Sequence, residues 1–98
     1  MISIDLSGKT ILITGALGAI AEHIVRRLIE SGATLVLTDI KADEEAKRTL
    51  GDWKISPSSY LYLSADVTES TQVEGLVSAA FEKFPGMDTV IEIGRAHV

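Results

Sequence analysis

The sequence predicts an α/β fold built on a doubly wound parallel sheet, truncated to about four strands. Short apolar runs alternate with segments of helical periodicity, a glycine turn joins the first run to the first helix, and an aspartate ends the second run. This alternation is typical of parallel strands that are joined by right-handed crossovers. The 98 residues allow one domain at most.

Four short apolar runs are the predicted strands. They cover residues 10–14, 34–38, 60–64 and 89–91. Short runs that stay apolar instead of alternating with polar residues suit strands that are buried on both faces of a sheet. Because each pair of runs is separated by a segment with helical character, we expect the strands to be parallel.

The first predicted helix covers residues 19–31. Its apolar side chains recur at helical spacing, with one stripe of Ile20, Ile24 and Leu28 and a neighbouring stripe of Ala21, Val25 and Ile29. Glu22 and Arg26 are four residues apart, which favours an ion pair on the solvent side. Gly32 is expected to end the helix.

Two further helices are predicted. One covers residues 43–50 and ends at Gly51, before a loop over residues 52–59. The other begins after Thr68, which we expect to be its N-cap, and stops before Pro85. The apolar stripe of this last helix consists of Val73, Leu76, Val77, Ala80, Phe81 and Phe84.

Composition narrows the class of function. The chain is 46% hydrophobic and carries a net charge of −5, with scattered basic residues, which argues against a nucleic-acid partner. The absence of cysteine excludes disulfides and thiolate metal sites, and His23 and His97 are too few for a metal centre. There is no signal-peptide pattern and no apolar run near the roughly 20 residues that span a bilayer. We therefore expect a cytoplasmic protein with no membrane partner.

The glycine turn and the aspartate carry the functional prediction. Gly15 lets the chain leave the strand and start a helix at once, because it has no Cβ to clash at the required backbone angles. The free N–H groups at the start of that helix suit a pyrophosphate. Asp39, about 20 residues further along, can accept hydrogen bonds from a ribose diol and would repel a 2′-phosphate, so it favours NAD over NADP. Ile40 follows it in place of a basic residue, although Lys41 could soften the preference.

Several motifs resemble the short-chain dehydrogenase/reductase family over nearly the whole chain. They are the lead into the first strand at residues 6–10, Thr14-Gly15 of the glycine motif, Asp39, the adenine-contacting pair Asp66-Val67, and the turn at residues 84–88. The resemblance implies that residues 1–91 are the N-terminal part of an NAD(P)-binding Rossmann domain. The cofactor-binding residues that it implies are Gly15, Leu17, Gly18, Ala19, Ile20, Asp39, Ile40, Asp66 and Val67.

The glycine motif departs from the family pattern. The single-domain branch of the family has glycines where this chain has Ala19 and Ala21, whereas Gly18 fits the spacing of the extended branch. Alanine at the position of Ala21, where the helix packs on the strand, is a common variant. Ala19 lies where the backbone should approach the pyrophosphate, and Gly18 could relieve the crowding. The long helix before Pro85 favours the single-domain branch.

The family's catalytic groups are not found in this sequence. The family uses a Tyr-x-x-x-Lys pair with an upstream serine, but neither Tyr60 nor Tyr62 is followed by a lysine four residues later. We therefore assign no catalytic residue. The resemblance implies a homo-oligomeric parent oxidoreductase that transfers a hydride between nicotinamide and an alcohol or carbonyl substrate. Two alternatives stay open: a non-catalytic NAD-binding or regulatory module, and an inactive fragment whose open fourth strand makes it aggregate.

The C-terminal segment, residues 92–98, also departs from the family. Where the family continues Asn-Asn-Ala-Gly after the fourth strand, this chain has Glu-Ile-Gly-Arg-Ala-His-Val. The codons GAG ATC GGA AGA GCA CAC GTC encode this segment, and from their second base they match the start of a common sequencing adapter. Our hypothesis is that residues 92–98 do not belong to the natural protein; the alternative is a genuine, divergent C-terminus.

Overall fold

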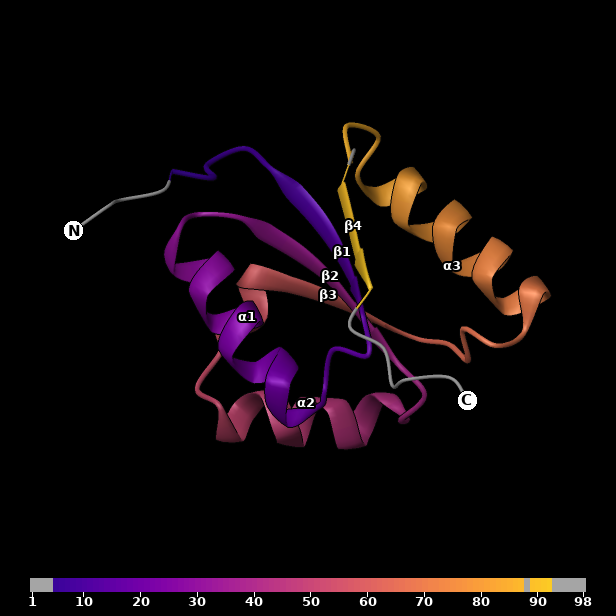
Figure 1. The fold of residues 1–98 in the computed structure, drawn as a ribbon, viewed down its shortest axis with the longest axis horizontal. Helices are drawn as coiled ribbons and strands as arrows, with labels where there is room; N and C mark the ends of the chain where they lie inside the picture. Colours follow the sequence, from indigo (N-terminus) through magenta and orange to yellow (C-terminus); the bar gives the residue numbers. More distant parts are fainter. Residues whose placement is uncertain (1–4, 88, 93–98) are drawn as a thin grey trace.

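The strands form one parallel sheet in the order β3-β2-β1-β4. The computed structural model describes residues 5–87 and 89–92. Its elements are β1 (Thr10–Thr14), α1 (Ala19–Glu30), β2 (Thr34–Asp39), α2 (Asp43–Asp52), a 3₁₀ turn (Pro57–Ser59), β3 (Tyr60–Ser64), α3 (Ser70–Lys83) and β4 (Thr89–Glu92) (Figure 1). The predicted α/β class and the predicted order of strands and helices are confirmed.

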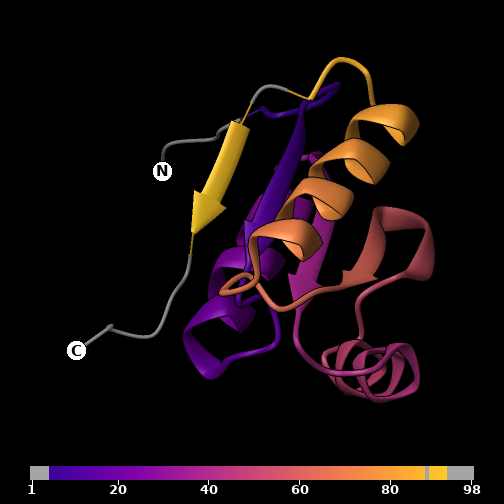
Figure 2. The same ribbon diagram turned by 90° about the vertical axis from the view of Figure 1, so that its right-hand side faces the viewer.

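The order of the strands places the helices on two faces. The chain moves from β1 outward to β2 and β3, then crosses back to β4 on the other side of β1. Because each crossover is right-handed, α1 and α2 cover one face of the sheet and α3 covers the other (Figure 2). The direction of winding therefore reverses between β1 and β4. In open α/β sheets, ligands bind beside the carboxyl ends of the strands at such a reversal.

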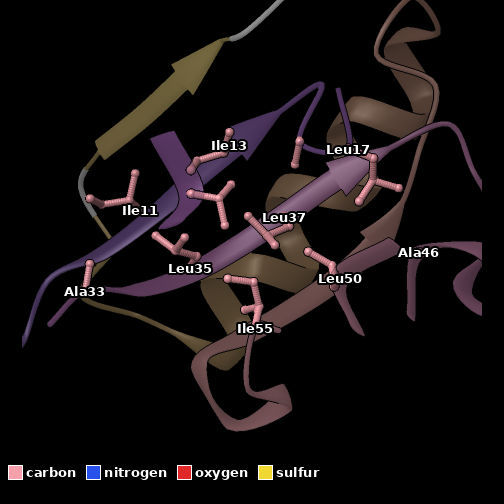
Figure 3. Close-up of a cluster of buried hydrophobic side chains, with 11 residues drawn as sticks. Ile11, Ile13, Leu17, Ala33, Leu35, Leu37, Ala46, Leu50 and Ile55 are labelled. Atoms are coloured by element: carbon pink, nitrogen blue, oxygen red, sulfur yellow. The ribbon is translucent and has the colours of Figure 1, made fainter. Parts of the chain in front are cut away.

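Alternate residues of the strands point to opposite faces of the sheet and belong to two separate hydrophobic cores. The first core cluster lies under α1 and α2 and contains Ile11, Ile13, Ala16, Leu17, Val25, Ala33, Leu35, Leu37, Ala46, Leu50 and Ile55 (Figure 3). The second core cluster lies under α3 and contains Leu12, Val36, Ala65, Leu76, Ala80 and Met87. Both sheet faces are therefore buried, as the continuous apolar runs predict.

In α1 the first member of the predicted apolar stripes does not face the core. Ala21 and Val25 are fully buried, whereas Ile20, the first member of the predicted stripe, is 73% exposed. Ile20 belongs to the first turn of α1, which lines a cleft at the end of the sheet instead of packing on the strands. The predicted ion pair between Glu22 and Arg26 is present, and the guanidinium also donates to the carbonyl of Trp53.

Two helix ends also differ from the sequence prediction. The second helix continues through Gly51 to Asp52, and its C-cap is Trp53. Thr68 is not the N-cap of α3; its N–H and Oγ1 both donate to Asp66 Oδ1 in a local turn. The helix starts two residues later, with Glu69 in the N-cap position.

β4 lies at one end of the sheet and pairs with β1. It includes Glu92, the first residue of the segment that our hypothesis questions; residues 93–98 lie outside the described residues. Val90 is 56% exposed, which agrees with the predicted apolar edge. In the part of the chain that the structure describes, no helix is long and apolar enough to cross a bilayer.

Candidate functional site

A cleft of about 590 Å³ lies at the carboxyl ends of the strands. Three segments line it: the glycine turn with the first turn of α1, the end of β2 with the loop that follows, and the loop after β3. These segments come from far apart in the sequence, and the parallel register of β1, β2 and β3 brings their ends to one edge of the sheet.

The glycine turn is shaped by one residue in a left-handed conformation. Gly15 has φ +65°, which an L side chain rarely adopts, and Ala16 then donates its N–H to the carbonyl of Thr38 at 3.0 Å. Gly18 is the N-cap of α1 in extended conformation, and no side chain among the described residues caps this helix end. The first N–H groups of α1 therefore remain available to an anion in the cleft.

Gly18 has no steric partner that requires a glycine. A Cβ built at this position would meet only the carbonyl oxygen of Gly15, at an ordinary contact distance of 3.7 Å. Within the described residues, the chain itself would therefore tolerate a side chain at this position. Because the residue lines the cleft, an approaching ligand would be the group that benefits from the missing Cβ.

The Asp39 carboxylate joins the end of β2 to the glycine turn. Its Oδ2 accepts the N–H of Leu17 at 3.1 Å, and its Oδ1 accepts the N–H of Ile40 at 2.7 Å. A carboxylate offers about four lone-pair positions, so these two bonds leave room for two hydroxyl donors. The side chain is half-buried and already oriented, and it lines the cleft.

The loop after β3 forms the third side. Asp66 Oδ1 accepts the N–H of Thr68 at 2.9 Å, and the N–H of Asp66 donates to Gln72 Oε1 at 2.8 Å. The start of α3 therefore holds this loop through side-chain bonds. Such bonds restrict the backbone of a segment that has no sheet partner of its own.

Apolar side chains are exposed around the same cleft. Ile20, Ile40 and Val67 are all exposed, and each lines it. Exposed apolar groups gathered at a hollow, with a few oriented polar groups, are typical of a small-molecule binding site. The charged lining residues are Asp39, Asp66 and Lys41, and the Lys41 ammonium lies 3.2 Å from the Glu45 carboxylate.

The predicted cofactor residues are brought together almost completely. All of them except Leu17 line the cleft. The side chain of Leu17 is instead buried in the first core cluster (Figure 3). Its N–H donates to the carboxylate of Asp39, which does line the cleft. Lining residues that the sequence did not predict are Thr14, Ala21, Lys41, Ala65 and Thr68. Each lies within two positions of a predicted residue in the sequence, and that adjacency was the available signal.

The fold and the cleft together define a class of protein: an α/β domain with a cleft at the reversal of its parallel sheet, which is where open α/β sheets bind ligands. The chain belongs to the short-chain dehydrogenase family, whose sequence model matches residues 9–93. A curated relative, the 2,5-dichloro-2,5-cyclohexadiene-1,4-diol dehydrogenase LinX of Sphingobium indicum, is 31% identical over 85 residues. That match covers 87% of this chain and 34% of the relative.

Solved structures show the same likeness. The short-chain dehydrogenase/reductase (glucose/ribitol dehydrogenase) of Brucella melitensis superposes with a TM-score of 0.78 at 30% identity, covering 91% of this chain and 37% of that one. The 3-ketoacyl-(acyl-carrier-protein) reductase of Brucella melitensis, solved in complex with NADH, has a TM-score of 0.74 at 31% identity. That match covers 88% of this chain and 34% of the reductase. The chain thus spans about a third of the length of the relatives that it matches.

Proposed function

We propose that this chain supplies the dinucleotide-binding part of an NAD-dependent oxidoreductase that transfers a hydride between nicotinamide and an alcohol or carbonyl carbon. The observation that carries the proposal is the oriented carboxylate of Asp39, hydrogen-bonded to the glycine turn at the side of the cleft. The bound NADH of the Brucella reductase supports it, because that protein shares this fold at 31% identity.

The pyrophosphate would lie at the N-terminus of α1. Uncapped N–H groups and the positive end of the helix dipole favour a negative group there. The open space beside Gly18 would let the phosphates approach the backbone, which compensates for the methyl group of Ala19 in the same lining. This assignment explains why a glycine occupies a position where the chain's own packing does not need one.

Asp39 would bind the adenosine ribose and set the preference for NAD. Its carboxylate oxygens can each accept one diol hydroxyl in addition to their present backbone donors. A 2′-phosphate in the same position would meet a like charge. Lys41, which could neutralise that phosphate, is already paired with Glu45.

The adenine ring would lie between exposed apolar side chains. Ile40 and Val67 line the cleft from the β2 and β3 loops, and they would lose contact with water when a flat ring covers them. Asp66, in the loop beside Val67, would face the polar edge of the ring. In this arrangement, binding the nucleotide buries the aliphatic groups that the free protein exposes.

The chemical step is assigned to another part of the parent protein. No Tyr-x-x-x-Lys pair occurs in this sequence, so the acid/base groups of our proposal lie outside these residues. We assign residues 1–91 to the N-terminal part of the domain and keep the hypothesis that residues 92–98 are not native. The nucleotide sequence around codon 92 tests it, because any codon string other than the adapter's contradicts it.

A second candidate function is a non-catalytic NAD-binding module. Three segments line the cleft, which supports nucleotide binding, and a Rossmann fold does not by itself imply turnover. The sequence of the parent gene beyond these residues separates the two. A Tyr-x-x-x-Lys pair with an upstream serine supports the oxidoreductase, and a gene without them supports the binding module.

Titration of NAD and NADP into the chain tests the proposed site. We expect NAD to bind more tightly, and Asp39→Ala to weaken NAD by about tenfold while changing NADP much less, because charge-assisted hydrogen bonds are worth roughly 1.5–3 kcal/mol. Asp39→Asn keeps the shape but replaces one carboxylate oxygen with an NH2 donor, so it should reduce the preference for NAD and also remove the acceptor of either the Leu17 or the Ile40 N–H. Asp52→Ala, an exposed carboxylate outside the cleft, is the matched control. Equal losses for both nucleotides would contradict the assigned role of Asp39.

A further inference from the structure

One hydroxyl of β3 reaches across to the loop that carries Asp39. Tyr62 donates to the carbonyl oxygen of Lys41 at 2.6 Å, and the carbonyl oxygen of Asp39 lies 3.1 Å from the same hydroxyl. A phenol has one proton, so the two carbonyls share it, with the shorter bond to Lys41 dominant. The bridge joins residues that are more than 20 positions apart in the sequence.

Neighbouring groups of β3 strengthen the same connection. Ser64 Oγ approaches the carbonyl of Ile40 at 3.5 Å, and the N–H of Ala65 donates to the carbonyl of Asp39 at 3.0 Å. β2 ends at Asp39, so the next carbonyls have left the sheet ladder. Three successive carbonyls, at positions 39, 40 and 41, thus accept hydrogen bonds from β3 or from the residue that follows it.

The tyrosine ring holds this hydroxyl in a defined place. Tyr62 lies opposite Leu37 in the register of β3 with β2, and its ring packs against the first core cluster. Tyr60 packs against the same cluster from the same strand. None of the hydrogen bonds found among the described residues involves the Tyr60 hydroxyl, which makes this residue a matched reference.

The tethered loop carries two of the three charged residues that line the cleft. Asp39, Ile40 and Lys41 all line the cleft, and the Asp39 carboxylate also accepts the N–H of Leu17 from the glycine turn. A shift of this backbone would therefore move the carboxylate relative to the turn. Binding groups lose much of their effect when their supports allow displacements of about 1 Å.

We propose that Tyr62 is a positioning residue of this site: its hydroxyl fixes the backbone of residues 39–41 and so orients the Asp39 carboxylate toward the ribose diol. This inference rests on the proposed function for the identity of the ligand. The tether consists of the hydrogen bond from Tyr62 to the loop at residues 39–41 and the bond from Leu17 to the Asp39 carboxylate, and both are present in the protein without a ligand.

The first arm of the test needs no ligand. Tyr62→Phe removes only the hydroxyl, and Tyr60→Phe is its control. Amide hydrogen exchange at Leu17 and Ile40, the two donors to the Asp39 carboxylate, should become about three- to tenfold faster in Tyr62→Phe, because one hydrogen bond of ordinary strength is lost. Tyr60→Phe should leave both rates unchanged. Unchanged rates in Tyr62→Phe would overturn the positioning role.

The second arm measures the ribose directly. NAD and its analogue that lacks the adenosine 2′-hydroxyl are titrated into the original chain and both variants. We expect Tyr62→Phe to raise the Kd for NAD by about three- to tenfold. The Kd values of NAD and of the analogue should therefore lie closer together in this variant than in the original chain. An equal loss for both ligands would overturn the inference. If the original chain binds neither ligand, the proposed function fails, while the amide rates still decide whether Tyr62 orients Asp39.

Discussion

The two faces of the sheet are filled to different degrees. Under α1 and α2, the first core cluster has 11 buried members, and Trp53, Tyr60 and Tyr62 pack against its margin. Under α3, the second cluster has six buried members, and both Phe81 and Val90 are exposed among the described residues. The face with two helices is thus well packed, whereas one helix leaves apolar surface uncovered on the other.

This difference follows from the topology and the span of the chain. Two crossovers run on one side of β1, but only one runs back to β4. The relatives that the chain matches are about three times as long. A single helix over this face therefore leaves Phe81 and Val90 exposed to water.

The largest expected effect is on the free energy of unfolding, when one buried leucine on each face of the sheet is replaced by alanine. Leu37→Ala, in the middle of the first cluster, should cost about 3–5 kcal/mol of unfolding free energy, whereas Leu76→Ala, under α3, should cost about 2–3 kcal/mol. The second site has fewer buried neighbours and can relax into the space. Urea denaturation followed by circular dichroism measures both. Equal losses would show that the two faces are packed equally well.

A smaller effect is expected for self-association. Val90 lies in register with Leu12, on the α3 face of the edge strand β4. Val90→Lys should weaken association of the chain by about tenfold, because a lysine on an edge strand opposes edge-to-edge pairing. Ser78→Lys, on the exposed side of α3, adds the same charge without removing apolar surface. Sedimentation equilibrium that shows a monomer for the original chain would contradict this prediction.

The smallest expected effect is a loss of stability at high pH, when Tyr62 on the well-packed face of the sheet ionises. Burial raises the pKa of Tyr62 to about 12, and the charges of Asp39, Asp43 and Glu45 act in the same direction, against a hydrogen bond with Ser64. An unfolded tyrosine ionises near 10, so the protonated phenol stabilises the fold fully below about pH 10, and this contribution is lost as the pH rises toward 12.

Absorbance at the phenolate band checks this in Tyr60→Phe, where Tyr62 is the remaining tyrosine. The folded variant should show little phenolate at about pH 11. The Tyr62→Phe protein should lose less stability than the original chain between about pH 10 and 12. Ionisation of Tyr62 near 10 in the folded state would contradict the expected burial effect.

The sequence by itself determined the elements and the type of site. Continuous apolar runs, helical periodicity and Gly15 are local signals, so the alternating order and the glycine turn could be predicted, and Asp39 followed from its place after the second strand. Most lining residues of the cleft were predictable for the same reason. A family pattern places them near the ends of strands, and parallel strands bring those ends to one edge.

Only the tertiary structure decided how these parts contact one another. The bond from Leu17 to Asp39, the tether from Tyr62 and the exposure of Ile20 depend on which strands are neighbours and in which register. Thr68 instead lies in a local turn in which the Asp66 carboxylate accepts both of its donors, and α3 begins only at Ser70. Hydrogen bonds between distant segments cannot be predicted from sequence periodicity, because strand order and packing determine their partners, and spacing along the chain does not.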